Sequence, residues 1–97
     1  MVPLLLYFFL FAEAMIDEAE KRGMANDNAK QLVLQAMKGA ALLAQRQPQS
    51  LKELRQAVTS PGGTTQAALE TLFEAGVDSS IANAVNAAVK RGQELGQ

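Results

Sequence analysis

The chain has 97 residues, with nine basic and ten acidic side chains and a net charge of −1. It is long enough for one domain with a modest core, and its basic residues are too few and too scattered to indicate nucleic-acid binding. It contains neither cysteine nor histidine, which excludes a disulfide framework, a thiolate nucleophile, the usual zinc sites and a histidine general base. Proton chemistry would therefore need a carboxylate, a lysine, the tyrosine, a hydroxyl or water.

The first twelve residues are almost wholly apolar, and three interpretations of them compete. The run is too short to span a membrane, because acidic residues end it from Glu13 onward. A secretory signal peptide needs basic residues at its start, and this chain has none before Lys21. A buried helix with Pro3 in its first turn fits best, and a helix that is apolar all round must be covered on every side. Since 97 residues offer little material for that, we infer a partner chain; the alternative is an exposed end.

The remaining sequence predicts an all-α domain of about five helices over residues 1–97, because no segment alternates apolar and polar residues as a strand would. Gly23 is placed to end the first helix. Four more are expected: one capped by Asn26 or Asp27 and running to about Arg46, one from the capping box at Ser50 to about Val58, one over roughly Thr65 to Ala75, and one capped by Asp78 or Ser79. Apolar residues recur at helical spacing in three of these helices: Leu32, Val33, Ala36, Met37, Ala40, Ala41 and Leu43; Ala68, Leu69, Leu72 and Phe73, which are expected to face inward; Ile81, Ala82, Val85, Ala88 and Val89, which form one stripe. Gly39, beside two alanines, indicates the close approach of another helix.

The run Val58–Thr65 combines a turn with a helix start. Pro61 fixes φ, and Gly62 and Gly63 permit positive φ and leave no Cβ to block a ligand. The two threonines that follow bring hydroxyls to the first helical turn, whose free N–H groups point outward. Such a loop can hold a small anion such as a carboxylate. Local chemistry alone favours the plainer interpretation, a helix connection in which Thr64 is only an N-cap.

Other polar residues give weaker signals. Glu13 and Asp17 share one helix face and could work as paired carboxylates, although a solvated helix side explains them as well. Tyr7 suits a core ring with its hydroxyl at an edge. Arg55 precedes the glycine loop and could attract an anion, and the plainer interpretation is a surface charge.

From Tyr7 to about Leu95 the chain resembles the C-terminal domain of pyrroline-5-carboxylate reductase, the last enzyme of proline biosynthesis. Tyr7–Met15 is similar to the start of the family's long dimerisation helix, and Leu32–Ala41 is similar to its second long helix. Val58–Thr65 matches the family signature and is the most specific part of the resemblance. The remainder, through Glu94 and Leu95, keeps the family's register.

The resemblance implies an all-helical domain that interlocks with a second copy as a homodimer, and such dimers often assemble further into rings. In the complete enzyme NADPH or NADH lies on an N-terminal Rossmann domain, and the substrate lies between that domain and the signature loop. The resemblance also implies that backbone N–H groups and hydroxyls at Ser60, Gly62, Gly63 and Thr64 hold the substrate carboxylate. Thr65 would then hydrogen-bond to the imine nitrogen, or pass it a proton as hydride arrives.

Two segments depart from the family pattern. Val2–Leu6 replaces a Gly-Ser-Gly-Pro-Ala-type lead-in, and Ala75–Val77 replaces Gly-Gly-Phe. No Gly-x-Gly-x-x-Gly motif occurs in the chain, so we expect these residues alone to bind no cofactor and no metal and to have no reductase activity. We expect the dimerisation and substrate-loop half of a cytoplasmic enzyme that contacts neither nucleic acid nor membrane.

Two other classes stay open. One is a stand-alone helical dimerisation or interaction module without catalysis. The other is a small membrane-associated protein anchored by its first twelve residues, which the shortness of the run and the lack of flanking basic residues disfavour.

Overall fold

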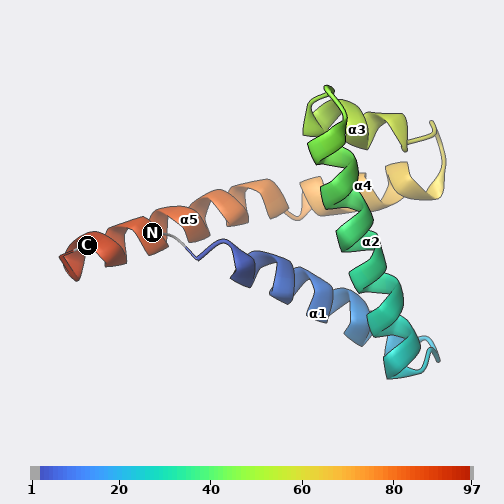
Figure 1. Cartoon of the computed structure of the whole chain (residues 1–97), viewed down its shortest axis with the longest axis horizontal. Helices are drawn as coiled ribbons and strands as arrows, with labels where there is room; N and C mark the ends of the chain where they lie inside the picture. The colour runs from blue at the N-terminus through green and yellow to red at the C-terminus, as the bar shows by residue number, and fades with distance from the viewer. Residues whose placement is uncertain (1–2, 97) are drawn as a thin grey trace. The chain divides into compact units, whose positions relative to one another are not determined.

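The computed structural model describes residues 3–96, and within them it contains five α-helices and no strand. In chain order they are α1 (Leu5–Lys21), α2 (Asn26–Arg46), α3 (Leu51–Ala57), α4 (Thr64–Glu74) and α5 (Val77–Glu94) (Figure 1). The predicted all-α class is therefore confirmed. The contacts divide the described chain into two compact units, one from Pro3 to Leu51 and one from Lys52 onward.

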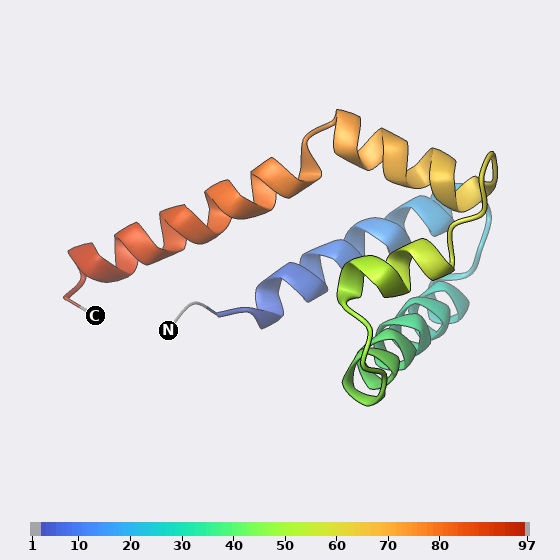
Figure 2. The ribbon, with the colours of Figure 1, turned by 90° about the horizontal axis from the view of Figure 1, so that it is seen from above.

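The first unit is the helix pair α1 and α2, which meet at the ends joined by their short loop and diverge away from it (Figures 1 and 2). Gly23 ends α1 as predicted, with φ +100° and its N–H donating to the Glu20 carbonyl oxygen at 2.9 Å. The Asn26 amide, at the start of α2, also donates to the Glu20 carboxylate at 2.7 Å. Among the described residues only Ala12 and Ala29 are buried. Small side chains thus occupy the one tightly packed part of this unit.

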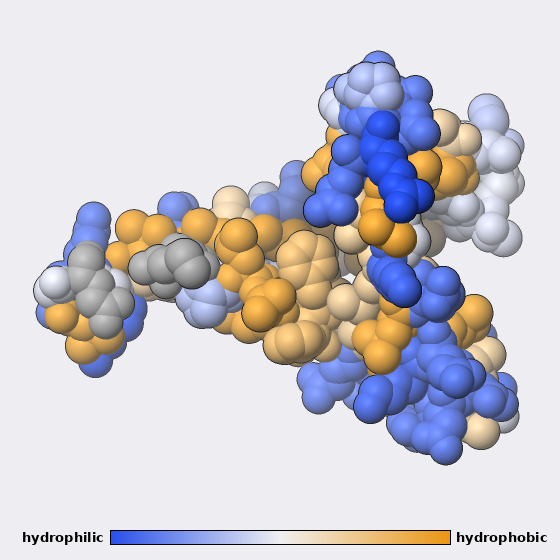
Figure 3. All heavy atoms as spheres, viewed as in Figure 1, coloured by the Kyte–Doolittle hydropathy of each residue, from blue (hydrophilic) through white to orange (hydrophobic). Residues whose placement is uncertain are grey.

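The first half of α1 leaves its large apolar side chains at the surface of the chain. Leu5, Phe8, Phe9 and Leu10 are all more than half exposed, and Phe9 is 65% exposed. In Figure 3 apolar side chains cover the first half of α1, whereas polar side chains dominate the second half of α1 and the visible surface of α2. Pro3 precedes the helix instead of lying in its first turn, because α1 begins at Leu5 with Leu4 as its N-cap. Val2, part of the altered lead-in, lies outside the described residues.

The second unit contains α3, α4 and α5. Helix α3 is tied to α4 by Arg55, whose guanidinium lies over the ring of Phe73 at 5.3 Å from its centroid. Gly76, with φ +80°, separates α4 from α5, and α5 continues beyond it as an extended rod (Figure 2). Most side chains of α5 are exposed within this unit, and only Val85, Ala88 and Gly92 are half-buried after its first residue.

Two predicted helix caps were wrong, by one to three residues. The N-cap of α2 is Ala25, in extended conformation, so Asn26 begins the helix and neither Asn26 nor Asp27 caps it. The N-cap of α5 is Gly76, because its left-handed conformation ends α4 and starts the next helix at once. Asp78 therefore lies in the first turn of α5, where its charge favours the helix dipole without capping it.

Helix α4 begins at Thr64 after Gly63 as N-cap and ends at Glu74, so each end lies one residue before the predicted span of roughly Thr65 to Ala75. Helix α3 likewise ends at Ala57, one residue before the predicted Val58.

In the single chain the apolar stripes of α2, α4 and α5 are largely exposed. Leu32 is 63% exposed, Phe73 46% and Val89 43%. The stripes exist at the predicted helical spacing, and most of their side chains are exposed. Among the described residues, no helix is long and apolar enough to cross a membrane.

Candidate functional site

The loop between α3 and α4, residues 58–63, begins with hydrogen bonds that terminate α3. The Val58 N–H donates to the Arg55 carbonyl oxygen at 3.3 Å, and the Thr59 N–H donates to that of Gln56 at 3.1 Å. The Thr59 hydroxyl adds a further bond to the Arg55 carbonyl at 2.7 Å. These bonds satisfy carbonyls that the end of a helix otherwise leaves without partners, and they fix the direction in which the chain leaves α3.

Ser60–Gly63 forms a tight turn. The Gly63 N–H donates to the Ser60 carbonyl oxygen at 3.0 Å, with Pro61 second and Gly62 third in the turn. Gly62 has φ +74°, so the turn has the residues and the positive φ of type II. Gly63 has an ordinary φ of −88°, but a Cβ on it would lie 3.2 Å from the Ser60 oxygen. The two glycines therefore suit the turn for different reasons: the first tolerates a left-handed backbone angle, and the second avoids a tight contact with the Ser60 oxygen.

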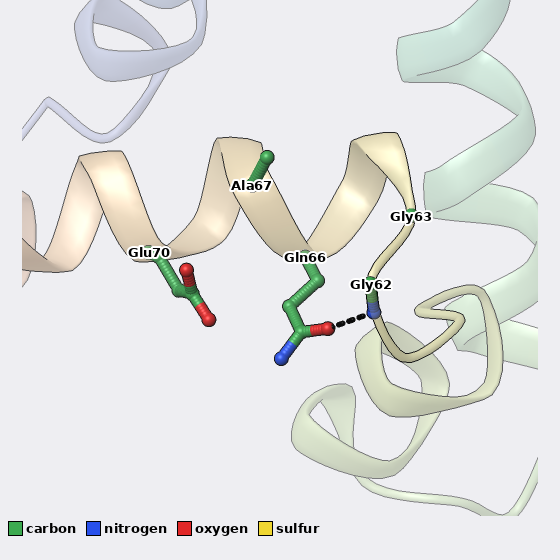
Figure 4. A pocket seen from close by; sticks show the side chains of 5 residues that line it. All are labelled: Gly62, Gly63, Gln66, Ala67 and Glu70. Carbon is green, nitrogen blue, oxygen red and sulfur yellow. Dashed lines mark hydrogen bonds between the residues drawn. The ribbon is translucent and has the colours of Figure 1, made fainter.

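Helix α4 begins with a cap that the sequence analysis did not foresee. No side chain caps Gly63, but the side-chain oxygen of Gln66, three residues later, accepts the N–H of Gly62 (Figure 4). In a capping box the side chain three residues after the N-cap accepts the N–H of the N-cap residue. Here it accepts the N–H of the residue just before the N-cap. Thr64 is the first helical residue and therefore not the N-cap, which corrects that detail of the plainer interpretation.

The free donors of the loop lie at the start of α4. The Ala67 N–H donates to the Gly63 carbonyl at 3.2 Å, whereas the N–H groups of Thr64, Thr65 and Gln66 have no acceptor among residues 3–96. Their dipoles add to that of the helix and favour a negative charge at this end. The Gly62 and Gly63 N–H groups, by contrast, are both used inside the loop.

A pocket of about 350 Å³ adjoins the turn and is lined by Gly62, Gly63, Gln66, Ala67 and Glu70. Figure 4 shows the Gln66 and Glu70 side chains on the same side of α4, one turn apart. Of the five predicted site residues, Gly62 and Gly63 line this pocket, and Ser60, Thr64 and Thr65 do not. Thr65 is half-buried and shares helical spacing with Leu69 and Leu72, on a different face of α4.

Sequence reasoning missed Gln66 and Glu70. The position of Gln66 carried a usable signal, because a glutamine three residues after an N-cap commonly reaches back to a backbone N–H. That signal was lost when the helix was expected to start one residue too late. Within residues 3–96 no cluster of three or more aspartate and glutamate side chains could hold a metal ion.

A family model described as pyrroline-5-carboxylate reductase dimerisation matches residues 5–95. The chain belongs to this family. It is 42% identical over 91 residues to a pyrroline-5-carboxylate reductase of Pseudomonas aeruginosa and 46% identical over 90 residues to one of Vibrio alginolyticus, covering 94% and 92% of this chain and 33% of each relative. The resemblance based on Val58–Thr65 is thereby confirmed.

Solved structures of the same family have the same fold. The pyrroline carboxylate reductase of Plasmodium falciparum, solved with NADP bound, matches with a TM-score of 0.91 at 33% identity over 95% of this chain and 35% of its own. That of Coxiella burnetii matches with a TM-score of 0.88 at 41% identity over 93% of this chain and 33% of its own. The 97 residues thus span about a third of the length of the relatives they match.

Proposed function

We propose that these residues are the C-terminal dimerisation and substrate-binding domain of a pyrroline-5-carboxylate reductase, which reduces 1-pyrroline-5-carboxylate to L-proline with NADPH or NADH in the cytoplasm. The observation that carries the proposal is the family match over residues 5–95, which includes the whole glycine loop. The 97 residues are expected to be inactive by themselves.

The geometry of the loop suits the carboxylate of such a substrate. The N–H groups of Thr64 and Thr65 lack acceptors within the described chain, and the hydroxyls of Ser60 and Thr64 lie beside them in sequence. Gly62 and Gly63 line the adjoining pocket, but their N–H groups are used inside the loop, so we assign the carboxylate to the N–H groups that follow them. A carboxylate at a helix N-terminus gains charge-assisted hydrogen bonds, which are shorter and stronger than neutral ones.

Thr65 is the residue we assign to the reacting imine. Its hydroxyl can hydrogen-bond to the ring nitrogen or deliver a proton to it as hydride reaches the adjacent carbon. Hydride transfer to a cyclic imine depends on positioning more than on a strong base, so the lack of histidine in this chain does not oppose the assignment.

A homodimer is the second part of the proposal, with larger rings built from dimers. It is supported by the apolar surface of α1, where Phe9 is 65% and Leu5 69% exposed in the single chain. A second copy of the same helix pair would cover these side chains on both partners at once, as a two-fold interface requires.

The dinucleotide needs residues beyond these. Residues 3–96 contain five helices and no strand, and the sequence has no Gly-x-Gly-x-x-Gly motif, so they do not form the strand–turn–helix unit that binds a pyrophosphate. When bound, NADPH or NADH would supply the hydride. The part of this chain would be to hold the carboxylate and the imine nitrogen.

A chimera tests the proposal directly. The N-terminal domain of the Pseudomonas aeruginosa relative, joined to this chain in place of its own C-terminal third, should oxidise NADPH only when 1-pyrroline-5-carboxylate is present. The 97-residue chain alone serves as the control and should give no turnover. A folded, dimeric chimera without turnover would contradict the proposal and favour an interaction module.

The loop assignment has its own test in that chimera. Gly63→Val should block backbone approach and abolish substrate binding while the dimer stays intact, because the added carbons crowd the turn beside the Ser60 oxygen. Gly63→Ala is the graded control and should raise KM less. An unchanged KM in Gly63→Val would remove the loop from the binding site.

A further inference from the structure

The Gln66 side chain makes a hydrogen bond to the glycine loop that has no part in the proposed function. Its amide oxygen accepts the Gly62 N–H, linking the left-handed residue of the turn to the first turn of α4. The side chain is half-buried, and it lies against the turn instead of extending into solvent (Figure 4).

We propose that Gln66 is a positioning residue that holds the glycine loop in its substrate-binding conformation before the substrate arrives. This inference rests on the proposed function, since it concerns how the loop meets the substrate carboxylate. Gln66 would act through Gly62 and would not itself touch the reacting atoms.

The physical need for such a residue follows from the glycines. Gly62 and Gly63 are adjacent, and glycine has the largest backbone freedom of any residue, so the free loop samples many conformations. The turn bond from Gly63 to Ser60 closes one ring, and the Gln66 bond closes a second ring that includes the start of α4. Together they fix the backbone directions on both sides of Thr64 and Thr65.

The expected consequence is confined to binding. A ligand that requires one loop conformation binds more weakly in proportion to the fraction of time the loop spends in it. Once substrate is bound it orders the loop itself, so the rate of the bound complex changes little. Removing the Gln66 oxygen should therefore raise KM and leave kcat nearly unchanged.

Glu70 provides a matched control. It is one turn further along α4, lines the same pocket and has no contact with Gly62 (Figure 4). Replacing it removes a polar side chain of similar length from the same helix face. It also removes a negative charge, which does not disfavour an anionic substrate, so KM should stay the same or fall.

The first experiment measures the Gly62 amide by NMR in the 97-residue chain. Its proton resonance should depend weakly on temperature in the unchanged chain and in Gln66→Glu, which keeps an oxygen acceptor. In Gln66→Met, which has similar volume and no such oxygen, the temperature dependence should become that of a solvated amide. Glu70→Met should leave it unchanged. An amide that behaves alike in Gln66→Met and in the unchanged chain overturns the proposal.

The second experiment measures kinetics in the chimera. Gln66→Met should raise KM for 1-pyrroline-5-carboxylate by roughly 2- to 10-fold, the range that the net contribution of one hydrogen bond allows, with kcat within about twofold. Glu70→Met should not raise KM. A Gln66→Met variant that alters the Gly62 amide while KM stays unchanged shows that the bond is only structural and overturns the positioning role.

The failure of the two proposals can be told apart. A chimera with no turnover before any substitution would overturn the proposed function. The Gly62 amide would still decide, in the 97-residue chain, whether Gln66 holds the loop.

Discussion

Helix α1 and the loop that precedes α4 differ in what the single chain provides for them: apolar side chains of α1 stay exposed, whereas the glycine N–H groups of the loop are hydrogen-bonded. The apolar half of α1 leaves Phe9 65% and Leu10 55% exposed, and among its residues only Ala12 is buried. In the loop, the Gly62 and Gly63 N–H groups both find acceptors within seven residues of sequence, on Gln66 and Ser60. The apolar half of α1 needs another surface to cover it, whereas the loop is fixed by hydrogen bonds to residues close to it in sequence.

Assembly and loop geometry should therefore be separable by mutation. Apolar surface is covered only by other atoms, so variants of α1 should change the oligomeric state and leave the Gly62 amide as it was. The hydrogen bonds of the loop are local, so variants there should change the loop while the dimer persists.

The largest effect is expected from Phe9→Glu on α1. Burying a phenylalanine contributes about 1.5–3 kcal/mol, a two-fold interface contains the side chain twice, and a buried unpaired carboxylate is costly. The dimer dissociation constant should rise at least about 100-fold, as measured by analytical ultracentrifugation. Gln31→Glu adds the same charge to an exposed position on α2 and should leave the dimer unchanged. An intact Phe9→Glu dimer would show that the apolar half of α1 lies outside the interface.

A second test concerns Gly39 on α2. It shares a helix face with Leu32, Ala36 and Leu43, and a Cβ on it would meet nothing within 4 Å in the single chain. A second copy, as proposed above, would supply the close helix approach that the sequence predicts at this glycine. Gly39→Leu should improve the helix by roughly 0.5–1 kcal/mol yet weaken the dimer about tenfold or more, because it fills the space the partner needs.

Both effects can be read from one concentration series of thermal unfolding. The variant should unfold at a lower temperature than the unchanged chain when dimeric, and at a higher one when diluted to monomer. A variant that is more stable at every concentration would place Gly39 on a free surface.

The sequence was sufficient for the number of helices, for the end of α1 at Gly23 and for the unburied apolar excess of α1, because each follows from local spacing and composition. It was insufficient wherever a glycine replaced a polar cap. Asp78 and Ser79 are good N-caps by type, but Gly76 in left-handed conformation both ends α4 and starts α5. The chain therefore reaches Asp78 when the helix has already begun.

The candidate site shows the same limit. The residues Ser60–Thr65 could be singled out from their types, but which N–H groups stay free depends on side-chain geometry. Gln66 removes the Gly62 donor from that set, and this contact depends on α4 starting at Thr64. A one-residue error in the helix start was enough to hide it.

Gly62→Ala should destabilise the second unit by about 1–2 kcal/mol, the cost of a left-handed conformation for a residue with a Cβ. No atom would obstruct the new methyl group within 4 Å, so the effect isolates backbone strain from crowding. Gly92→Ala, within the regular part of α5, is the matched control and should instead stabilise by about 0.5–1 kcal/mol. Urea unfolding measures both, and changes of equal sign would contradict the assigned turn.

The smallest effect is expected at the contact that joins α3 to α4. The Arg55 guanidinium lies 5.3 Å from the centre of the half-exposed Phe73 ring, and at such a site the attraction is worth about 0.5–1 kcal/mol. Arg55→Met keeps much of the aliphatic stem and removes the charge, so the free energy of unfolding should fall by that amount in urea titrations. Lys52→Met removes a charge from an exposed position on the same helix and should have no measurable effect.

Because the contact lies outside the loop, the Gly62 amide resonance should be unchanged in both variants. A shift in Arg55→Met alone would mean that the packing of α3 on α4 holds the loop together with Gln66.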